Sequence, residues 1–269
     1  MSIGRSVEGR EQIVVANFDL NATRPETAPT FLIGGVHGDE PATVLLLEAF
    51  TERYLLDMTE PVAVLALCNP DGYRRATRYN ARHVDLNRNC GFRWRANSLE
   101  PAGPAPWSEP EICAVRDFIE QWRPGKVVSL HWALAELDAD GPQSTPCALA
   151  MWAALSDKER SAYRLRVTPA APDIKGSQHS QELECPGSLG QWCAYGFCPE
   201  GGIAPAMITL ELPYDPALDC RPAILPADHL ETLQVLWKRD SERYLREVGV
   251  GVFKMLNAAC QFLGVRGAA

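Results

Sequence analysis

The chain has 269 residues, of which 46% are hydrophobic, and it carries a formal net charge of −8 at pH 7. This charge argues against a nucleic-acid partner, because non-specific binding to phosphates requires a basic face. It does not exclude an anionic substrate, since a few local arginines can make one pocket positive.

Targeting and membrane signals are missing from the sequence. The sequence contains no run of about 18 apolar residues, so we expect no membrane span and no membrane partner. The first ten residues hold no apolar stretch of the signal-peptide type. The nine cysteines include no CxxC pair, as is typical of reduced thiols. We therefore expect a cytoplasmic protein, and since no linker stands out, a single domain over residues 1–269. The sequence gives no indication of its oligomeric state.

Buried strands and helices alternate along the chain. The expected strands cover residues 13–18, 31–36, 62–68, 126–130 and 206–212. The expected helices cover residues 41–56, 109–122, 148–160, 227–248 and 251–263. Residues 62–68 are apolar throughout, as expected for a strand covered on both faces. This alternation predicts an α/β sandwich with a mostly parallel sheet, and a long irregular loop is expected over residues 168–205.

A histidine and a glutamate follow the second expected strand at a spacing that suits a metal. The run GGVHGDEP, residues 34–41, ends a strand, presents His37 and Glu40, and begins a helix at Pro41. An imidazole and a carboxylate on one tight turn can bind the same zinc ion, and the glycines permit a close approach of the backbone. The alternative is a surface histidine beside a helix-capping acid.

A third ligand is expected at the end of another buried strand. His131 ends the run KVVSLH, residues 126–131, and sites in α/β sheets gather at the carboxyl ends of strands. Alone, His131 would be read as a core or cleft histidine. With His37 and Glu40 it completes a set of three ligands, which leaves one coordination position open, as in catalytic zinc sites. We expect one Zn²⁺ per chain.

Two further segments carry polar groups that suggest catalysis. Glu211 lies near the end of the apolar run AMITLEL, where a carboxylate is costly to bury without a purpose. An elevated pKa would suit it as a general base, although a structural ion pair is the alternative. Residues 69–89 contain five arginines between Arg74 and Arg88 and end in DLNRN. A guanidinium and an amide together bind a carboxylate in two-pronged fashion.

These motifs together resemble the zinc metallocarboxypeptidase family, in its compact bacterial branch. They occur in the family's order between residues 4 and 213. The motifs are GRSVEGR at 4–10, HGDE at 37–40, NPDG at 69–72, RYN at 78–80, DLNRN at 85–89, SLH at 129–131 and TLEL at 209–212. The resemblance implies a three-layer α/β/α sandwich with a mixed, mostly parallel central sheet.

The resemblance also implies roles for individual residues. Glu211 would act as general base and then general acid, and Arg78 would stabilise the oxyanion. Asn87 and Arg88 would bind the free carboxylate of the residue that is released. The expected activity is hydrolysis of an amide next to a residue with a free carboxylate, in a small peptide or muropeptide. The γ-D-glutamyl–meso-diaminopimelate bond of murein peptides is the expected example.

Some positions depart from the family pattern and keep other functions open. Cys90 replaces an aromatic residue, His83 replaces a glycine, and the tyrosine that many carboxypeptidases place over the substrate has only Tyr195 and Tyr214 as candidates. The first alternative is a deacylase of N-acyl amino acids, which resembles aspartoacylase and succinylglutamate desuccinylase. The second is an inactive carboxylate-binding module.

Overall fold

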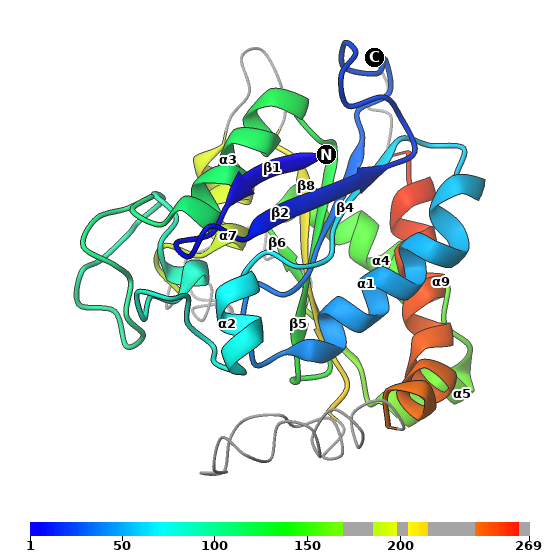
Figure 1. The fold of residues 1–269 in the computed structure, drawn as a ribbon. Coiled ribbons are helices and arrows are strands. Elements are labelled where there is room, and N and C mark those ends of the chain that lie inside the picture. Colours follow the sequence, from blue (N-terminus) through cyan, green and yellow to red (C-terminus); the bar gives the residue numbers. More distant parts are fainter. Residues whose placement is uncertain (169–184, 198–203, 215–239, 264–269) are drawn as a thin grey trace.

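An eight-stranded mixed sheet forms the centre of the molecule, in the order β1-β2-β4-β3-β5-β8-β6-β7 (Figure 1). The computed structural model describes residues 1–168, 185–197, 204–214 and 240–263. The strands are β1 (Ser2–Arg5), β2 (Glu11–Ala16), β3 (Thr30–Ile33), β4 (Val62–Leu65), β5 (Lys126–Trp132), β6 (Glu136–Asp140), β7 (Arg166–Thr168) and β8 (Ala206–Leu212). No helix among the described residues is long and apolar enough to cross a membrane.

The main helices lie on both faces of the sheet (Figure 1). They are α1 (Pro41–Tyr54), α2 (Pro70–Arg75), α3 (Pro110–Trp122), α4 (Thr145–Ala153), α5 (Asp157–Tyr163), α7 (Leu189–Gln191) and α9 (Val250–Gln261). One apolar core joins α1, α4 and α9 to the sheet, and a second joins α3 and α7 to the opposite face. The expected three-layer sandwich is confirmed.

Alternating side chains of the central strands supply these two cores. On β3, Leu32 belongs to the core under α1, whereas Phe31 and Ile33 belong to the core under α3. All three are fully buried, because a strand sends successive side chains to opposite faces. Strands that are apolar throughout are therefore required at the centre of the sheet.

The strand directions bring several chain segments to one edge of the sheet. Strand β3 pairs in parallel with β4 and β5, and β5 pairs in parallel with β8. The carboxyl ends of β3, β5 and β8 therefore meet at the same edge. The pairs β1/β2, β2/β4 and β6/β8 are antiparallel, which makes the sheet mixed.

The structure corrects one expected helix. Residues 148–160 do not form one helix, because α4 ends at Ala153 and α5 begins at Asp157. Ser156 caps α5: its side chain accepts a hydrogen bond from the backbone N–H of Glu159, while the Glu159 carboxylate accepts one from the backbone N–H of Ser156. Such a reciprocal cap starts a new helix. Of the expected helix over 227–248, residues 227–239 lie outside the described residues.

Candidate active site

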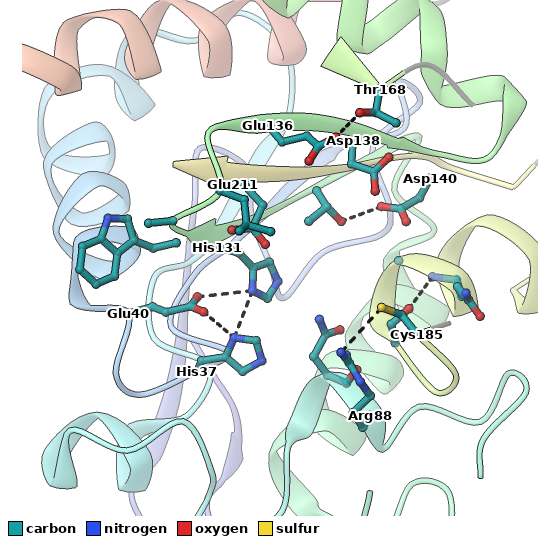
Figure 2. Close-up of a pocket in the computed structure, with 18 of the residues that line it drawn as sticks. His37, Glu40, Arg88, His131, Glu136, Asp138, Asp140, Thr168, Cys185 and Glu211 are labelled. Carbon is teal, nitrogen blue, oxygen red and sulfur yellow. Dashed lines mark hydrogen bonds and ion pairs between the residues drawn. The ribbon is translucent and has the colours of Figure 1, made fainter. Parts of the chain in front are cut away.

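The side chains of His37, Glu40 and His131 converge at the carboxyl edge of β3 and β5 (Figure 2). All three are buried, and one ligand atom from each lies within 4.8 Å of the others. The Nδ1 atoms of the two histidines are 3.3 Å apart. Nδ1 of His131 lies 3.4 Å from Oε2 of Glu40, and Nδ1 of His37 lies 2.7 Å from Oε1 of Glu40.

The two separations that involve His131 suit a zinc ion. Two atoms that each bind a tetrahedral zinc at about 2.0–2.1 Å lie about 3.4 Å apart, close to the 3.3 and 3.4 Å observed. Oε2 of Glu40 is buried and has no hydrogen-bond partner among the described residues. A bound cation would satisfy it. Two imidazoles and a carboxylate are also a common donor set of catalytic zinc sites.

The turn after β3 brings His37 and Glu40 together. Gly35 adopts a φ of +59°. The Thr43 hydroxyl accepts a hydrogen bond from the backbone N–H of Gly35 and donates one to the Glu40 carbonyl. At Gly38 an added Cβ would lie 2.0 Å from the carbonyl carbon of Gly72. A residue without a side chain is therefore required where this turn crosses the start of α2.

The far nitrogens of both histidines have partners of their own. Nε2 of His37 lies 3.2 Å from Oδ1 of the buried Asp85, and Nε2 of His131 lies 3.0 Å from Oγ of Ser129. A neutral imidazole that donates from Nε2 keeps its lone pair on Nδ1. Asp85 thereby favours the tautomer in which Nδ1 of His37 can bind a metal.

Buried charges around the two ligands of the turn shift their pKa values. Burial acts to lower the pKa of His37, but the carboxylates of Glu40 and Asp85 outweigh it and raise that pKa to about 9. Burial acts to raise the pKa of Glu40, but His37 and His131 outweigh it and lower that pKa to about 2. The site therefore strongly favours an ionised carboxylate beside a positive charge.

Glu211 and Arg78 both lie near this cluster. Glu211 on β8 is opposite His131 in the β5–β8 register, and burial raises the pKa of its carboxyl group. Arg78 donates from Nε to Oδ2 of Asp85 at 2.9 Å, and its Nη1 lies 3.3 Å from Nδ1 of His37. Both line one cavity of about 460 Å³ together with His37, Glu40 and His131.

Asn87 and Arg88 line the same cavity and are held by backbone contacts. Oδ1 of Asn87 accepts a hydrogen bond of 2.9 Å from the N–H of Leu189, so its Nδ2 is the donor end. Arg88 donates from Nη1 to the Asn87 carbonyl at 2.8 Å, and its Nη2 lies 3.7 Å from Sγ of Cys185. The sequence predictions for His37, Glu40, Arg78, Asn87, Arg88, His131 and Glu211 thus fall on residues that share one cavity.

The two candidate tyrosines differ in position. Tyr214 lines the cavity and packs on Trp132, with ring centroids 5.5 Å apart. Tyr195 stacks on Phe92 at 6.1 Å and is not among the described residues that line this cavity.

The sequence assigned no role to several residues that the structure places at the site. Asp85 was recognised only as part of the DLNRN motif. A row of acids on β6, Glu136, Asp138 and Asp140, lines the cavity with Gln191 from α7. A possible signal was the acid at every second position of residues 136–140, which places all three on one face of a strand.

Comparisons with known proteins agree with this geometry. A family model described as zinc carboxypeptidase matches residues 1–134. Murein peptide amidase A of Escherichia coli K12 is 31% identical over 178 residues, and the match covers 61% of this chain and 65% of that protein. Murein peptide amidase A of Vibrio campbellii is 29% identical over 212 residues, and the match covers 73% of this chain and 77% of that protein. The match thus spans less than two thirds of the Escherichia coli protein.

Solved structures show the same fold. The crystal structure of murein-tripeptide amidase from Escherichia coli O157 has a TM-score of 0.56 at 25% identity, and the match covers 89% of this chain and 90% of that one. Thrombin activatable fibrinolysis inhibitor has a TM-score of 0.65 at 19% identity, with 98% of this chain and 70% of that one covered. At that identity the second match supports the fold alone.

Proposed function

We propose that this chain belongs to the zinc carboxypeptidase family, whose model matches residues 1–134, and that it is a zinc-dependent metallopeptidase that hydrolyses an amide next to a residue with a free carboxylate. The observation that carries the proposal is the convergence of ligand atoms from His37, Glu40 and His131, of which Nδ1 of His131 lies at the spacing of a tetrahedral metal site from both of the others. This set opens on the cavity that also holds Glu211 and Arg88. We further propose one zinc ion per chain, a single catalytic domain over residues 1–269 and a cytoplasmic location.

Zinc bound by these three residues would polarise the scissile carbonyl and lower the pKa of a water molecule. Side chains of the protein carry out proton transfer, charge stabilisation and substrate binding. Glu211, whose carboxyl has a raised pKa, accepts the proton of the attacking water and later donates it to the leaving amine. Arg78, fixed by Asp85, stabilises the negative charge that develops on the carbonyl oxygen. Asn87 and Arg88 bind the carboxylate of the departing residue and so orient the amide.

The murein tripeptide is the substrate that the named relatives suggest. Both relatives are called murein peptide amidase A, and the similar crystal structure from Escherichia coli O157 is that of a murein-tripeptide amidase. We propose the γ-D-glutamyl–meso-diaminopimelate amide as the bond that is cleaved, because it lies next to a residue with a free carboxylate.

A turnover screen with zinc-loaded protein tests the proposal. The substrates are a γ-D-glutamyl–meso-diaminopimelate peptide, an ordinary peptide with a free C-terminal carboxylate, and an N-acyl amino acid. We expect the first to be hydrolysed with the highest kcat/KM, and the His131→Ala protein to be inactive. Preference for the N-acyl amino acid would instead identify a deacylase, and zinc stoichiometry near zero in freshly purified protein would indicate an inactive binding module.

A further inference from the structure

A turn of the chain, followed by the first residue of α7, lies against the proposed carboxylate clamp of Asn87 and Arg88. The turn and that residue are residues 185–189. The backbone N–H of Leu189 donates to Oδ1 of Asn87 at 2.9 Å. At Gly187, which has a φ of +75°, an added Cβ would lie 2.3 Å from the carbonyl oxygen of Arg88. The turn therefore packs directly on the backbone of the clamp, where a glycine is required.

Two neutral acceptors hold the guanidinium of Arg88 (Figure 2). Its Nη1 donates to the backbone carbonyl of Asn87 at 2.8 Å, and its Nη2 lies 3.7 Å from Sγ of Cys185. A carbonyl carries no net charge, and a thiol sulfur is a weak, neutral acceptor. These contacts orient the guanidinium and leave its positive charge without a compensating carboxylate among the described residues.

The second arginine of the cavity is held differently. Among the described lining residues, the arginines are Arg78 and Arg88. Nε of Arg78 donates to Oδ2 of Asp85 at 2.9 Å, and its Nη1 lies 3.9 Å from Oε1 of Glu40. Two carboxylates of the protein thus face Arg78, whereas Arg88 keeps its charge available for the carboxylate of a ligand.

The thiol of Cys185 is suited to a neutral contact. Cys185 lines the cavity and is half-buried. Burial raises the pKa of its thiol, and although Arg88 acts to lower that pKa, Asp140 and Asp138 act in the same direction as burial. The neutral thiol is therefore the form present at pH 7. A thiolate would instead pair with Arg88 and compete with a bound carboxylate.

We infer that Cys185 is a positioning residue for Arg88, which it orients toward the carboxylate of the released residue without neutralising the guanidinium. Cys185 acts through Arg88 rather than on the reacting groups. A carboxylate at this position would hold Arg88 more tightly but would compete with the substrate, and an apolar side chain would leave Nη2 without this acceptor. The inference rests on the proposed function, because it assumes that Arg88 binds the released carboxylate.

Binding of an uncleavable ligand tests this role separately from turnover. The probe is a γ-D-glutamyl–meso-diaminopimelate peptide in which a CH₂–NH link replaces the scissile amide. Its partner compound has the carboxylate next to that link converted to an amide. We expect the unaltered, zinc-loaded protein to bind the carboxylate form about tenfold or more tightly than the amide form. Isothermal titration calorimetry measures both affinities.

Three substitutions of Cys185 separate orientation from charge. Cys185→Ala removes the acceptor and should weaken binding of the carboxylate probe about three- to tenfold. Cys185→Ser supplies another neutral acceptor and should restore most of that affinity. Cys185→Asp keeps an acceptor but neutralises Arg88, and should abolish the preference for the carboxylate form. With a cleavable substrate, these effects should appear in KM with little change in kcat.

A second cysteine and a second background serve as controls. Cys113→Ala is the matched substitution, because this half-buried thiol contacts the carbonyl of Trp107 and is not among the described residues that line the cavity. It should leave both affinities unchanged. In an Arg88→Ala background, Cys185→Ala should cause no further loss of affinity, since the partner of the thiol is absent.

The outcomes separate the inference from the proposed function. Equal affinity of the Cys185→Ala and unaltered proteins for the carboxylate probe would overturn the positioning role, as would the same loss in the Arg88→Ala background. If the unaltered protein showed no preference for the carboxylate form, the clamp and the inference would both be wrong. If the expected binding pattern occurred without hydrolysis of any substrate in the turnover screen, the proposed peptidase would be wrong and the role of Cys185 would stand.

Discussion

The carboxylate of Asp85 lies against the imidazole of His37, with Oδ1 3.2 Å from Nε2. Its second oxygen accepts a hydrogen bond of 2.9 Å from Nε of Arg78. One fully buried carboxylate thus joins a candidate metal ligand to the candidate oxyanion donor. Removal of its charge should therefore affect both.

We expect Asp85→Asn to weaken zinc binding by about 10- to 100-fold, because the amide no longer holds His37 in the tautomer that leaves Nδ1 unprotonated. Competition against a chelator of known affinity measures the change. Asp138→Asn is the control and should keep the affinity, since it alters an acid of the same cavity on β6, a strand that carries none of the three ligands. Equal zinc affinity in the Asp85 variant and the unaltered protein would contradict this role.

Glu211→Gln should retain stoichiometric zinc and lose turnover by about 10²- to 10⁴-fold, because an amide cannot accept and return a proton. Glutamine has nearly the same size as glutamate, so the substitution should preserve the packing of β8. Metal analysis and steady-state kinetics on the same preparation separate the two effects. If the variant kept normal kcat, another group would have to be the base.

Arg88→Ala should raise KM for substrates with a free carboxylate, with a smaller effect on kcat, because binding of that carboxylate is lost. Substrates whose carboxylate is converted to an amide provide the comparison. The unaltered protein should prefer the free form, and the variant should treat both forms alike. A preference that survives the substitution would rule out Arg88 as the carboxylate clamp.

A prediction away from the site concerns the junction of α5 and α9. Nζ of Lys254 on α9 lies 2.7 Å from Oε1 of Glu159, which also forms the cap of α5 with Ser156. Burial acts to raise the pKa of Glu159, but hydrogen bonds from Lys254 and Ser156 outweigh it and lower that pKa to about 2. The ionised form is therefore the stabilising one.

Glu159→Gln should lower the free energy of unfolding at pH 7 by roughly 0.5–1 kcal/mol, because it removes the negative charge that contacts Lys254 and lies in the first turn of α5, while the amide can still accept the Ser156 hydrogen bond. A carboxyl with a lowered folded pKa stabilises above its unfolded value and loses that contribution as pH falls. The difference between variant and unaltered protein should therefore shrink between about pH 4.5 and pH 2. Urea unfolding at several pH values measures it, and a difference that stays constant with pH would contradict the assignment.

The sequence was most informative where a single physical requirement, such as burial of a strand on both faces, determined the residues. The strand over residues 206–212 was predicted with its observed bounds, because a strand buried on both faces must be apolar throughout. His37 and Glu40 were predicted as a pair because a local turn brings them together, and their spacing is visible in the sequence. The fold class followed from the same alternation of apolar segments.

Features that depend on distant contacts were not predictable in this way. Strand β6 has the sequence ELDAD, whose acid at every second position fits a strand but which lacks the apolar residues that predict one, so its pairing with β8 was needed to identify it. The role of Asp85 depends on its approach to His37, which is 48 residues away in the chain. No single-sequence pattern encodes that tertiary distance.

The position of the acid row in the chain has an evolutionary consequence. His131 and Glu211 are neighbours in the β5–β8 register, while β6 and α7 belong to the stretch of chain between these two strands. His131 and Glu211 thus flank, in sequence, a part of the cavity lining. Substitutions on β6 and α7 would thus change the lining of the cavity without altering the strands that hold His131 and Glu211.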